Sequence, residues 1–155
     1  MNAKKLLILA TGLVLVLAVT ACTRHDVDQP SPVGPSTLAT ILKISANPNV
    51  LNAGTHRQGA TITASLKKYD GTPLAGRTVY FEINDAEDVR ANIGFFEDRK
   101  IIASRVTDGG GNAYVTYLAP VKDEIRANCI VHIWASLPGD ERTFLQEFTE
   151  IFIVR

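Results

Sequence analysis

Residues 61–83 read TITASLKKYDGTPLAGRTVYFEI, and this stretch decides the fold class. In its first six residues, Ile62, Ala64 and Leu66 alternate with polar residues, and its last six, TVYFEI, alternate in the same way. Apolar residues at every second position are typical of a β-strand with one buried face. Between the two runs lies Asp70-Gly71, a turn signal, because glycine tolerates the positive φ that a side chain with a Cβ resists. The stretch therefore predicts two strands joined by a turn.

The same alternation extends over the rest of the chain beyond residue 38. We expect strands at 41–46, 61–66, 78–83, 100–106, 113–118, 128–136 and 143–154. Turn residues separate them, including Asn47-Pro48, the glycines at 109–111 and Pro138-Gly139. Several short strands with turns between them favour an all-β, antiparallel immunoglobulin-like β-sandwich of about seven strands. No segment has a convincing helical period, although 85–92 is compatible with a short helical turn or a loop.

Composition excludes several classes of protein. The chain has 155 residues, enough for one domain with attachments, and 16 basic residues balance 16 acidic ones. Because no net charge remains, a nucleic-acid-binding protein is disfavoured. Two cysteines are too few for a disulfide framework or a zinc cluster. The apolar content of 46% argues against a disordered chain.

The N-terminus has the features of a secretory signal. Lys4 and Lys5 precede an uncharged apolar run at 6–21, LLILATGLVLVLAVTA. As a helix this run would be roughly 24 Å long, shorter than the hydrocarbon core of a bilayer at about 30 Å. A positive start, an apolar middle and small residues at the end are typical of a signal peptide.

The end of this signal resembles the lipobox of bacterial lipoproteins. It reads Val19-Thr20-Ala21-Cys22. The resemblance implies that residues 1–21 are removed and that Cys22 is acylated with several chains, enough for stable membrane attachment. Thr23 stands where an aspartate retains enterobacterial lipoproteins in the inner membrane, so the outer membrane is favoured. The alternatives are an ordinary signal peptide and an uncleaved anchor.

Residues 22–38 read CTRHDVDQPSPVGPSTL and are predicted to be a tether. Pro30, Pro32 and Pro35 favour extended conformations, and no apolar period is present. The expected organisation is therefore a signal peptide at 1–21, a lipidated cysteine with a Pro-rich spacer at 22–38, and one folded domain at 39–155.

Two signatures in the domain resemble bacterial immunoglobulin-like domains of the invasin/intimin type (Big-1). The first is an Asp-Gly-x-Pro turn followed by a strand: Asp70, Gly71, Pro73, Gly76, Val79 and Phe81. The second opens a later strand: Thr107, Asp108, Gly111, Ala113, Val115 and Thr116. The turn GTPLAG also occurs in other secreted β-sandwich modules, including carboxypeptidase-regulatory-like and transthyretin-like ones.

The resemblance covers roughly residues 41–136 and implies a module for binding or adhesion at the cell surface. Adhesins of that family stack several such domains on an outer-membrane barrel, whereas this chain has one. The second hypothesis is therefore a structural or accessory periplasmic lipoprotein that scaffolds an envelope complex. The sequence does not identify the protein or glycan partner.

An acidic segment follows the strand expected at 78–83. Asp85, Glu87 and Asp88 carry the oxygen ligands that Ca²⁺ prefers. The spacing of an EF-hand is missing, so we expect no metal and favour a solvated acidic turn balanced by Arg90 and Arg99.

The same segment contains the adjacent pair Phe95 and Phe96. In a strand, one of them points inward and the other outward, so we expect this pair to close one end of the sandwich. The alternative is that the outward ring joins a contact patch.

On the strand expected at 128–136, His132 and Trp134 share one face. If Cys129, Val131 and Ile133 face inward, His132 and Trp134 are exposed and available to a ligand such as a glycan. The alternative, which we favour, is cross-strand packing with the terminal strand. Cys129 is expected to act as a small hydrophobe without a disulfide, because acylated Cys22 has no free thiol.

No sequence pattern predicts catalysis. The chain lacks a Gly-x-Ser-x-Gly elbow, a His-Glu-x-x-His pair, a Cys-x-x-Cys pair and a phosphate-binding glycine loop. We therefore expect a binding or structural protein that is not an enzyme and needs no cofactor.

Overall fold

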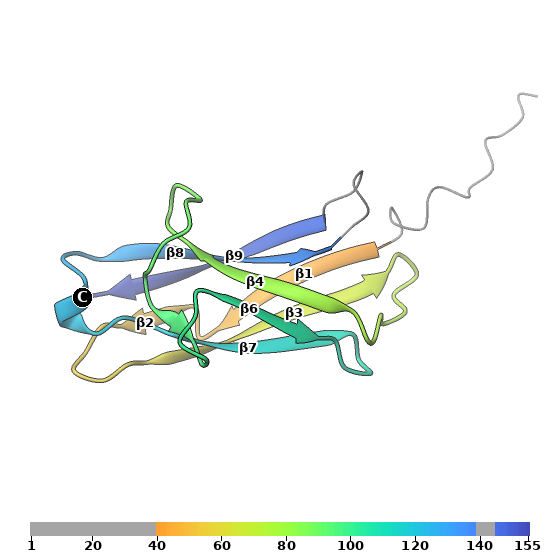
Figure 1. Ribbon diagram of the computed structural model, residues 1–155, viewed down its shortest axis with the longest axis horizontal. Helices are drawn as coiled ribbons and strands as arrows, with labels where there is room; N and C mark the ends of the chain where they lie inside the picture. The colour runs from red at the N-terminus through yellow and green to blue at the C-terminus, as the bar shows by residue number, and fades with distance from the viewer. Residues whose placement is uncertain (1–39, 139–144) are drawn as a thin grey trace, which may run out of the picture. The chain divides into compact units, whose positions relative to one another are not determined.

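A computed structural model describes residues 40–138 and 145–155, and these residues form a β-sandwich (Figure 1). Its strands are β1 (Thr40–Asn47), β2 (Val50–Asn52), β3 (Gly59–Lys68), β4 (Thr78–Asn84), β5 (Phe95–Phe96), β6 (Ile102–Val106), β7 (Asn112–Leu118), β8 (Cys129–Leu137) and β9 (Leu145–Val154). A 3-10 turn, η1 (Lys122–Glu124), precedes β8. The all-β fold class expected from the sequence is confirmed.

The strands form two sheets, ordered β1-β3-β7-β5 and β2-β9-β8-β4-β6. Apart from β2 and β6, this is the strand order of an immunoglobulin-like sandwich, four strands facing three. The seven expected strands are all present within the described residues, and the short β2 and β5 are additional. The position of the fourth immunoglobulin strand is taken by the two-residue β5, which lies inside the segment interpreted as a loop.

The first strand of the domain is divided between the two sheets. β1 pairs with β3, and after the Asn47–Pro48 bend the chain joins the opposite sheet as β2. β2 runs parallel to β9, with Val50 opposite Phe152. This short pair is the one parallel pairing among the described strands of the predicted antiparallel sandwich. Every other strand pair is antiparallel.

The core lies between the sheets and consists of the inward-facing residues that the alternation predicted. Val79, Phe81, Ala113 and Val115 are all buried, as expected. The ring of Phe81 meets the ring of Phe96 edge to face, with centroids 6.4 Å apart. The second sheet thus packs against a phenylalanine that belongs to the β4–β6 connection.

Two glycines of the sequence signatures lie in turns where the backbone conformation requires glycine. Gly71 has φ +86° and Gly111 has φ +76°, the left-handed region that only glycine enters without strain. At Gly111 an added Cβ would also lie 2.4 Å from the carbonyl oxygen of Leu66. The chain therefore has no room for a side chain at this position.

Thr107 and Asp108 of the second signature hold the same end of the sandwich together. The buried Thr107 hydroxyl donates to the Leu74 carbonyl at 2.7 Å and accepts from the Arg77 amide at 2.9 Å. Asp108 Oδ1 accepts from the amides that follow it in the turn. These residues are scaffold, because their polar atoms are used within the fold.

The signal peptide, Cys22 and the Pro-rich tether lie outside the described residues, and their predictions remain predictions. Within residues 40–138 and 145–155, no helix has the length and apolar character needed to cross a membrane.

Candidate functional site

β8 presents the aromatic residues singled out in the sequence. Val131, Ile133 and Ala135 face the core and are fully buried, so His132 and Trp134 point to the outer face of the sheet, as predicted. The exposed, ligand-accessible alternative does not hold for His132, because only 8% of this residue is accessible. The reason is the loop that follows β4, which folds back over this part of β8.

The terminal strand packs against these residues, which confirms the cross-strand interpretation. Phe148 of β9 lies directly opposite Trp134, and their ring centroids are 4.9 Å apart with planes inclined by 34°. Its ring is also 4.7 Å from the ring of His132. Three aromatic rings therefore form a contiguous group across β8 and β9.

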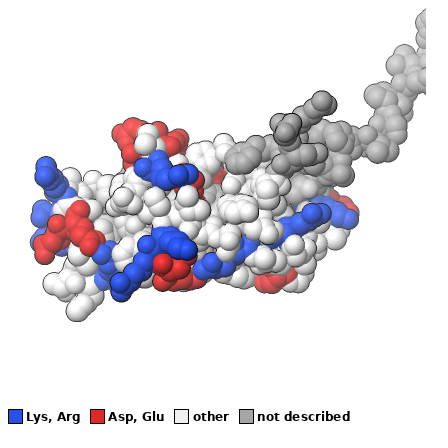
Figure 2. Space-filling view, viewed as in Figure 1, with Lys and Arg blue, Asp and Glu red and all other residues white. Residues whose placement is uncertain are grey.

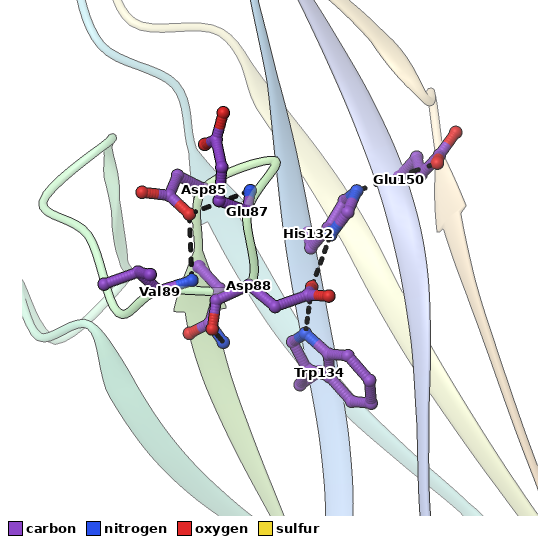
Figure 3. A network of polar contacts seen from close by, with 8 residues as sticks. Asp85, Glu87, Asp88, Val89, His132, Trp134 and Glu150 are labelled. Atoms are coloured by element: carbon purple, nitrogen blue, oxygen red, sulfur yellow. Dashed lines mark hydrogen bonds and ion pairs between the residues drawn. The ribbon is translucent and has the colours of Figure 1, made fainter.

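Asp88 fastens the β4 loop to this group (Figure 3). Its Oδ1 lies 2.6 Å from Nδ1 of His132 and accepts a hydrogen bond from Nε1 of Trp134 at 3.1 Å. The hydrogen bond from His132 is the largest influence on the Asp88 carboxyl and holds its pKa below the ordinary value. Because an ionised carboxylate can only accept, Nδ1 of His132 carries the proton in this contact. On the other side of the ring, Nε2 lies 3.6 Å from Glu150.

The loop has its own internal support. Asp85 Oδ1 accepts from the amides of Glu87 and Val89, and the Asp85 amide donates to the Val89 carbonyl. Asp88 adopts φ +61°, which turns its side chain toward the sheet. The segment is therefore a compact turn rather than the short helical turn that the sequence also allowed.

The geometry does not favour calcium. In Figure 3 the carboxylates of Asp85, Glu87 and Asp88 point in three different directions. Among the described residues, no three histidine, cysteine or acidic side chains are grouped so as to hold a metal ion. The expected balancing by Arg90 is wrong in detail, because Arg90 makes a two-pronged ion pair with Glu82 of β4.

A buried amide lies beneath the loop. Asn84 ends β4 and donates from Nδ2 to the Asp88 carbonyl at 3.0 Å, whereas its Oδ1 is buried without a hydrogen-bond partner. Leaving a buried acceptor unpaired costs about 1–3 kcal/mol. Asn84 thus supports the loop through the Asp88 carbonyl, while the oxygen of the same Asn84 amide is left unpaired.

Phe95 and Phe96 behave as the adjacent-pair prediction states. Phe96 is fully buried, and Phe95 is partly exposed with the Arg57 guanidinium 4.4 Å above its ring. Arg57 also pairs with Glu124 and donates to the Ala119 carbonyl, which closes this end of the sandwich. The contact-patch alternative for Phe95 is therefore not favoured.

Cys129 forms no disulfide with any described residue, and Cys22 lies outside them. Burial raises the pKa of the Cys129 thiol, which makes it a weak nucleophile. Its side chain packs against the core, as expected of a small hydrophobe.

Sequence reasoning missed two functional contributors. Phe148 lies in a predicted strand, but only its register opposite Trp134 shows that it completes the aromatic group. Asp88 was considered as a metal ligand, and its contact with a strand 44 residues away has no local signal. Gly94, immediately before the phenylalanine pair, was the available signal for β5, since its φ of +77° permits close approach to β7.

Comparison with known proteins adds little to this geometry. No family model matches the chain, and no curated protein matches it. Among solved structures, the chain is similar to the E. coli chaperone DraB, with 10% identity, 74% of this chain and 55% of that chain covered, and a TM-score of 0.49. It is also similar to AggA, the major subunit of aggregative adherence fimbriae type I from Escherichia coli, with 14% identity, coverage of 74% and 94%, and a TM-score of 0.43. For WR4, a C. elegans MSP family member, the values are 9%, 72% and 95%, and 0.40. The chain spans about half the length of DraB, and these likenesses concern the fold alone.

Proposed function

We propose that this chain is a lipid-anchored protein of the bacterial cell envelope whose single immunoglobulin-like module acts in binding or adhesion at the cell surface. The observation that carries the proposal is the pairing of two features in one chain. A lipobox-like Val19-Thr20-Ala21-Cys22 ends the apolar N-terminal run, and a Pro-rich stretch then leads to one β-sandwich. A spacer of this kind would hold a folded module away from the bilayer to which Cys22 is attached.

We assign the module to the invasin/intimin type as part of this proposal. The support is that the signature residues have structural roles in turns. Gly71 and Gly111 take left-handed conformations, and the Thr107 hydroxyl links its own segment to Leu74 and Arg77 before β4. Because carboxypeptidase-regulatory-like and transthyretin-like modules share the first turn, the assignment depends on the second signature, from Thr107 to Thr116.

We propose binding rather than catalysis because the carboxylates that could act as acids or bases are hydrogen-bonded within the fold. The carboxylates of Asp85 and Asp108 cap backbone amides, and Asp88 fastens the loop. Among the outward residues of β8 and β9, Trp134, Phe148 and Phe152 are partly exposed aromatic side chains, which are suited to contact.

The anchor is tested by membrane partitioning of Cys22→Ala in the native host. We expect the wild-type chain to fractionate with membranes and Cys22→Ala to lose this attachment. Cys129→Ala is the matched control, because it removes the chain's other cysteine and should leave partitioning unchanged. Equal partitioning of Cys22→Ala and wild type would remove the lipid anchor from the proposal.

Protease treatment of intact and lysed cells tests the location, with a C-terminal tag as readout. Cleavage on intact cells supports a surface module on the outer membrane, as Thr23 favours. Cleavage only after lysis would contradict the surface role and leave the accessory periplasmic lipoprotein as the function.

A further inference from the structure

The loop after β4 is held in a conformation with two unfavourable features. Asp88 has φ +61°, in the left-handed region that a residue with a Cβ enters only at a cost. Beneath it, Oδ1 of Asn84 is buried and has no hydrogen-bond partner among the described residues. The ladder between β4 and β8 requires neither feature, because it pairs every residue from Tyr80 to Asn84 without the loop. Unfavourable local geometry of this kind concentrates at binding and switching sites.

One carboxylate oxygen joins the tip of the loop to β8. Oδ1 of Asp88 lies 2.6 Å from Nδ1 of His132 and accepts from Nε1 of Trp134 at 3.1 Å. The two donors are two residues apart on one strand, and the ring of Phe148 packs against both of their rings. The sheet thus holds a pair of N–H groups aimed at one point, and the loop supplies the oxygen that occupies it. Charge-assisted hydrogen bonds make a carboxylate the preferred acceptor there.

The tip of the loop can leave this position while its base stays attached. The base is held by the ion pair between Arg90 and Glu82 and by the Ala91 amide, which donates to the Ile83 carbonyl. The side chain of Asp88 is already 51% exposed. Figure 2 shows acidic side chains gathered where the loop after β4 projects from the sandwich, so a released carboxylate would be hydrated at once.

Replacing Asp88 by another carboxylate would leave the charge around the imidazole unchanged. His132 and Trp134 would keep an ionised acceptor, and Glu150 would remain 3.6 Å from Nε2 on the other side of the ring. A cation at the same point would face two N–H donors, and an amide oxygen would be a weaker acceptor. The donor pair therefore selects a carboxylate.

We propose that Asp88 is an internal mimic of the ligand, and that His132 and Trp134 bind an aspartate or glutamate side chain of a partner protein when the loop tip lifts. The present occupant is itself an aspartate on an exposed turn, which favours a peptide over a sugar acid. The contact of Asp88 is then autoinhibitory. The proposal rests on the binding function proposed above and names where that binding occurs and what it selects.

Trp134 supplies the assay, because it is the only tryptophan of the chain. Its fluorescence and its single indole N–H signal in NMR spectra report directly on the acceptor. The purified full-length protein is titrated with the end-capped peptide Gly-Leu-Asp-Leu-Gly, whose only carboxylate is the aspartate side chain. The same peptide with asparagine and free galacturonate are the controls. We expect saturable binding of the aspartate peptide with a shift of the indole signal, and neither effect with asparagine.

Variants test the autoinhibitory contact. Asp88→Ala removes the internal competitor and should bind the aspartate peptide about tenfold more tightly, as expected when the wild-type site is open in about a tenth of the molecules. Glu87→Ala is the matched control, because this neighbouring carboxylate points away from His132 and Trp134 in Figure 3, and it should bind as wild type does. Adding His132→Phe to Asp88→Ala should abolish the gain.

The asparagine peptide gives the same test should the double variant fail to fold, since it should bind Asp88→Ala at least tenfold more weakly than the aspartate peptide. Four results would overturn the proposal. They are no binding to wild type at a hundred times the concentration that saturates Asp88→Ala, equal affinity of wild type and Asp88→Ala, equal affinity of the two peptides, and tighter binding of galacturonate. The envelope role is tested separately by Cys22→Ala and by protease treatment, so either proposal can fail while the other stands.

Discussion

Oδ1 of Asp88 lies 2.6 Å from Nδ1 of His132, and this single contact joins the tip of the β4 loop to the outer face of β8. It explains why a histidine on the outside of the sandwich is nearly buried. It also gives the loop a dependence on pH, because the carboxylate is the acceptor for two donors at once.

Acidification should release this contact. The Asp88 pKa is lowered in the folded state, so the carboxylate contributes stability above its ordinary pKa of 3.8, and that contribution is lost as the pH falls through the folded value. We expect Asp88→Asn to unfold at lower denaturant than wild type at about pH 5, with the difference shrinking toward about pH 2. Urea unfolding across this range measures it. Glu87→Gln is the control, and an Asp88→Asn difference that stays constant with pH would contradict the assignment.

Replacement of Gly111 by alanine should destabilise the sandwich strongly. The new Cβ would sit 2.4 Å from the Leu66 carbonyl oxygen in a left-handed residue, so we expect a loss of about 2 kcal/mol or more. Gly109→Ala tests the same turn without either problem, because no atom lies within 4 Å of its Cβ position. Thermal unfolding of both variants decides the matter, and similar melting temperatures would show that the turn is not constrained as described.

The sequence predicted the strands well because their information is local. In β3 and β4 each apolar residue sits two positions from the next, so burial follows directly from the pleat. The parallel pairing of β2 with β9 was not predictable, since three residues carry no period and their partner is a hundred residues away. The burial of His132 was missed for the same reason: its cause, Asp88, lies on another segment.

Phe95 and Phe96 should differ sharply on truncation. Phe96 is fully buried against Phe81, so Phe96→Ala should cost about 3–5 kcal/mol in the free energy of unfolding. Phe95→Ala loses only a partly exposed ring and its contact with Arg57, for which we expect about 1 kcal/mol. Chemical denaturation of both variants measures the difference, and a larger loss at Phe95 would reverse the inward and outward assignment.

Thr107 should tolerate serine and reject valine. Its buried hydroxyl makes two hydrogen bonds, to the Leu74 carbonyl and from the Arg77 amide, and valine leaves both partners unpaired. We expect Thr107→Val to cost about 1–3 kcal/mol, whereas Thr107→Ser keeps both bonds and loses only a methyl group. If the two substitutions prove equally destabilising in urea, packing rather than hydrogen bonding is the role of this side chain.

The division of the first strand between two sheets has a mechanical consequence. Because β2 runs parallel to β9, the entry of β2 and the exit of β9 lie at opposite ends of the pair. Force applied between residues 40 and 155 therefore shears the β2–β9 hydrogen bonds, so that they are loaded at the same time. A pull between residues 137 and 145, which face each other across β8 and β9, would open that ladder one bond at a time. In single-molecule stretching we expect the first geometry to yield at the higher force, so the sandwich would resist tension applied along its length more than tension applied across the β8–β9 ladder.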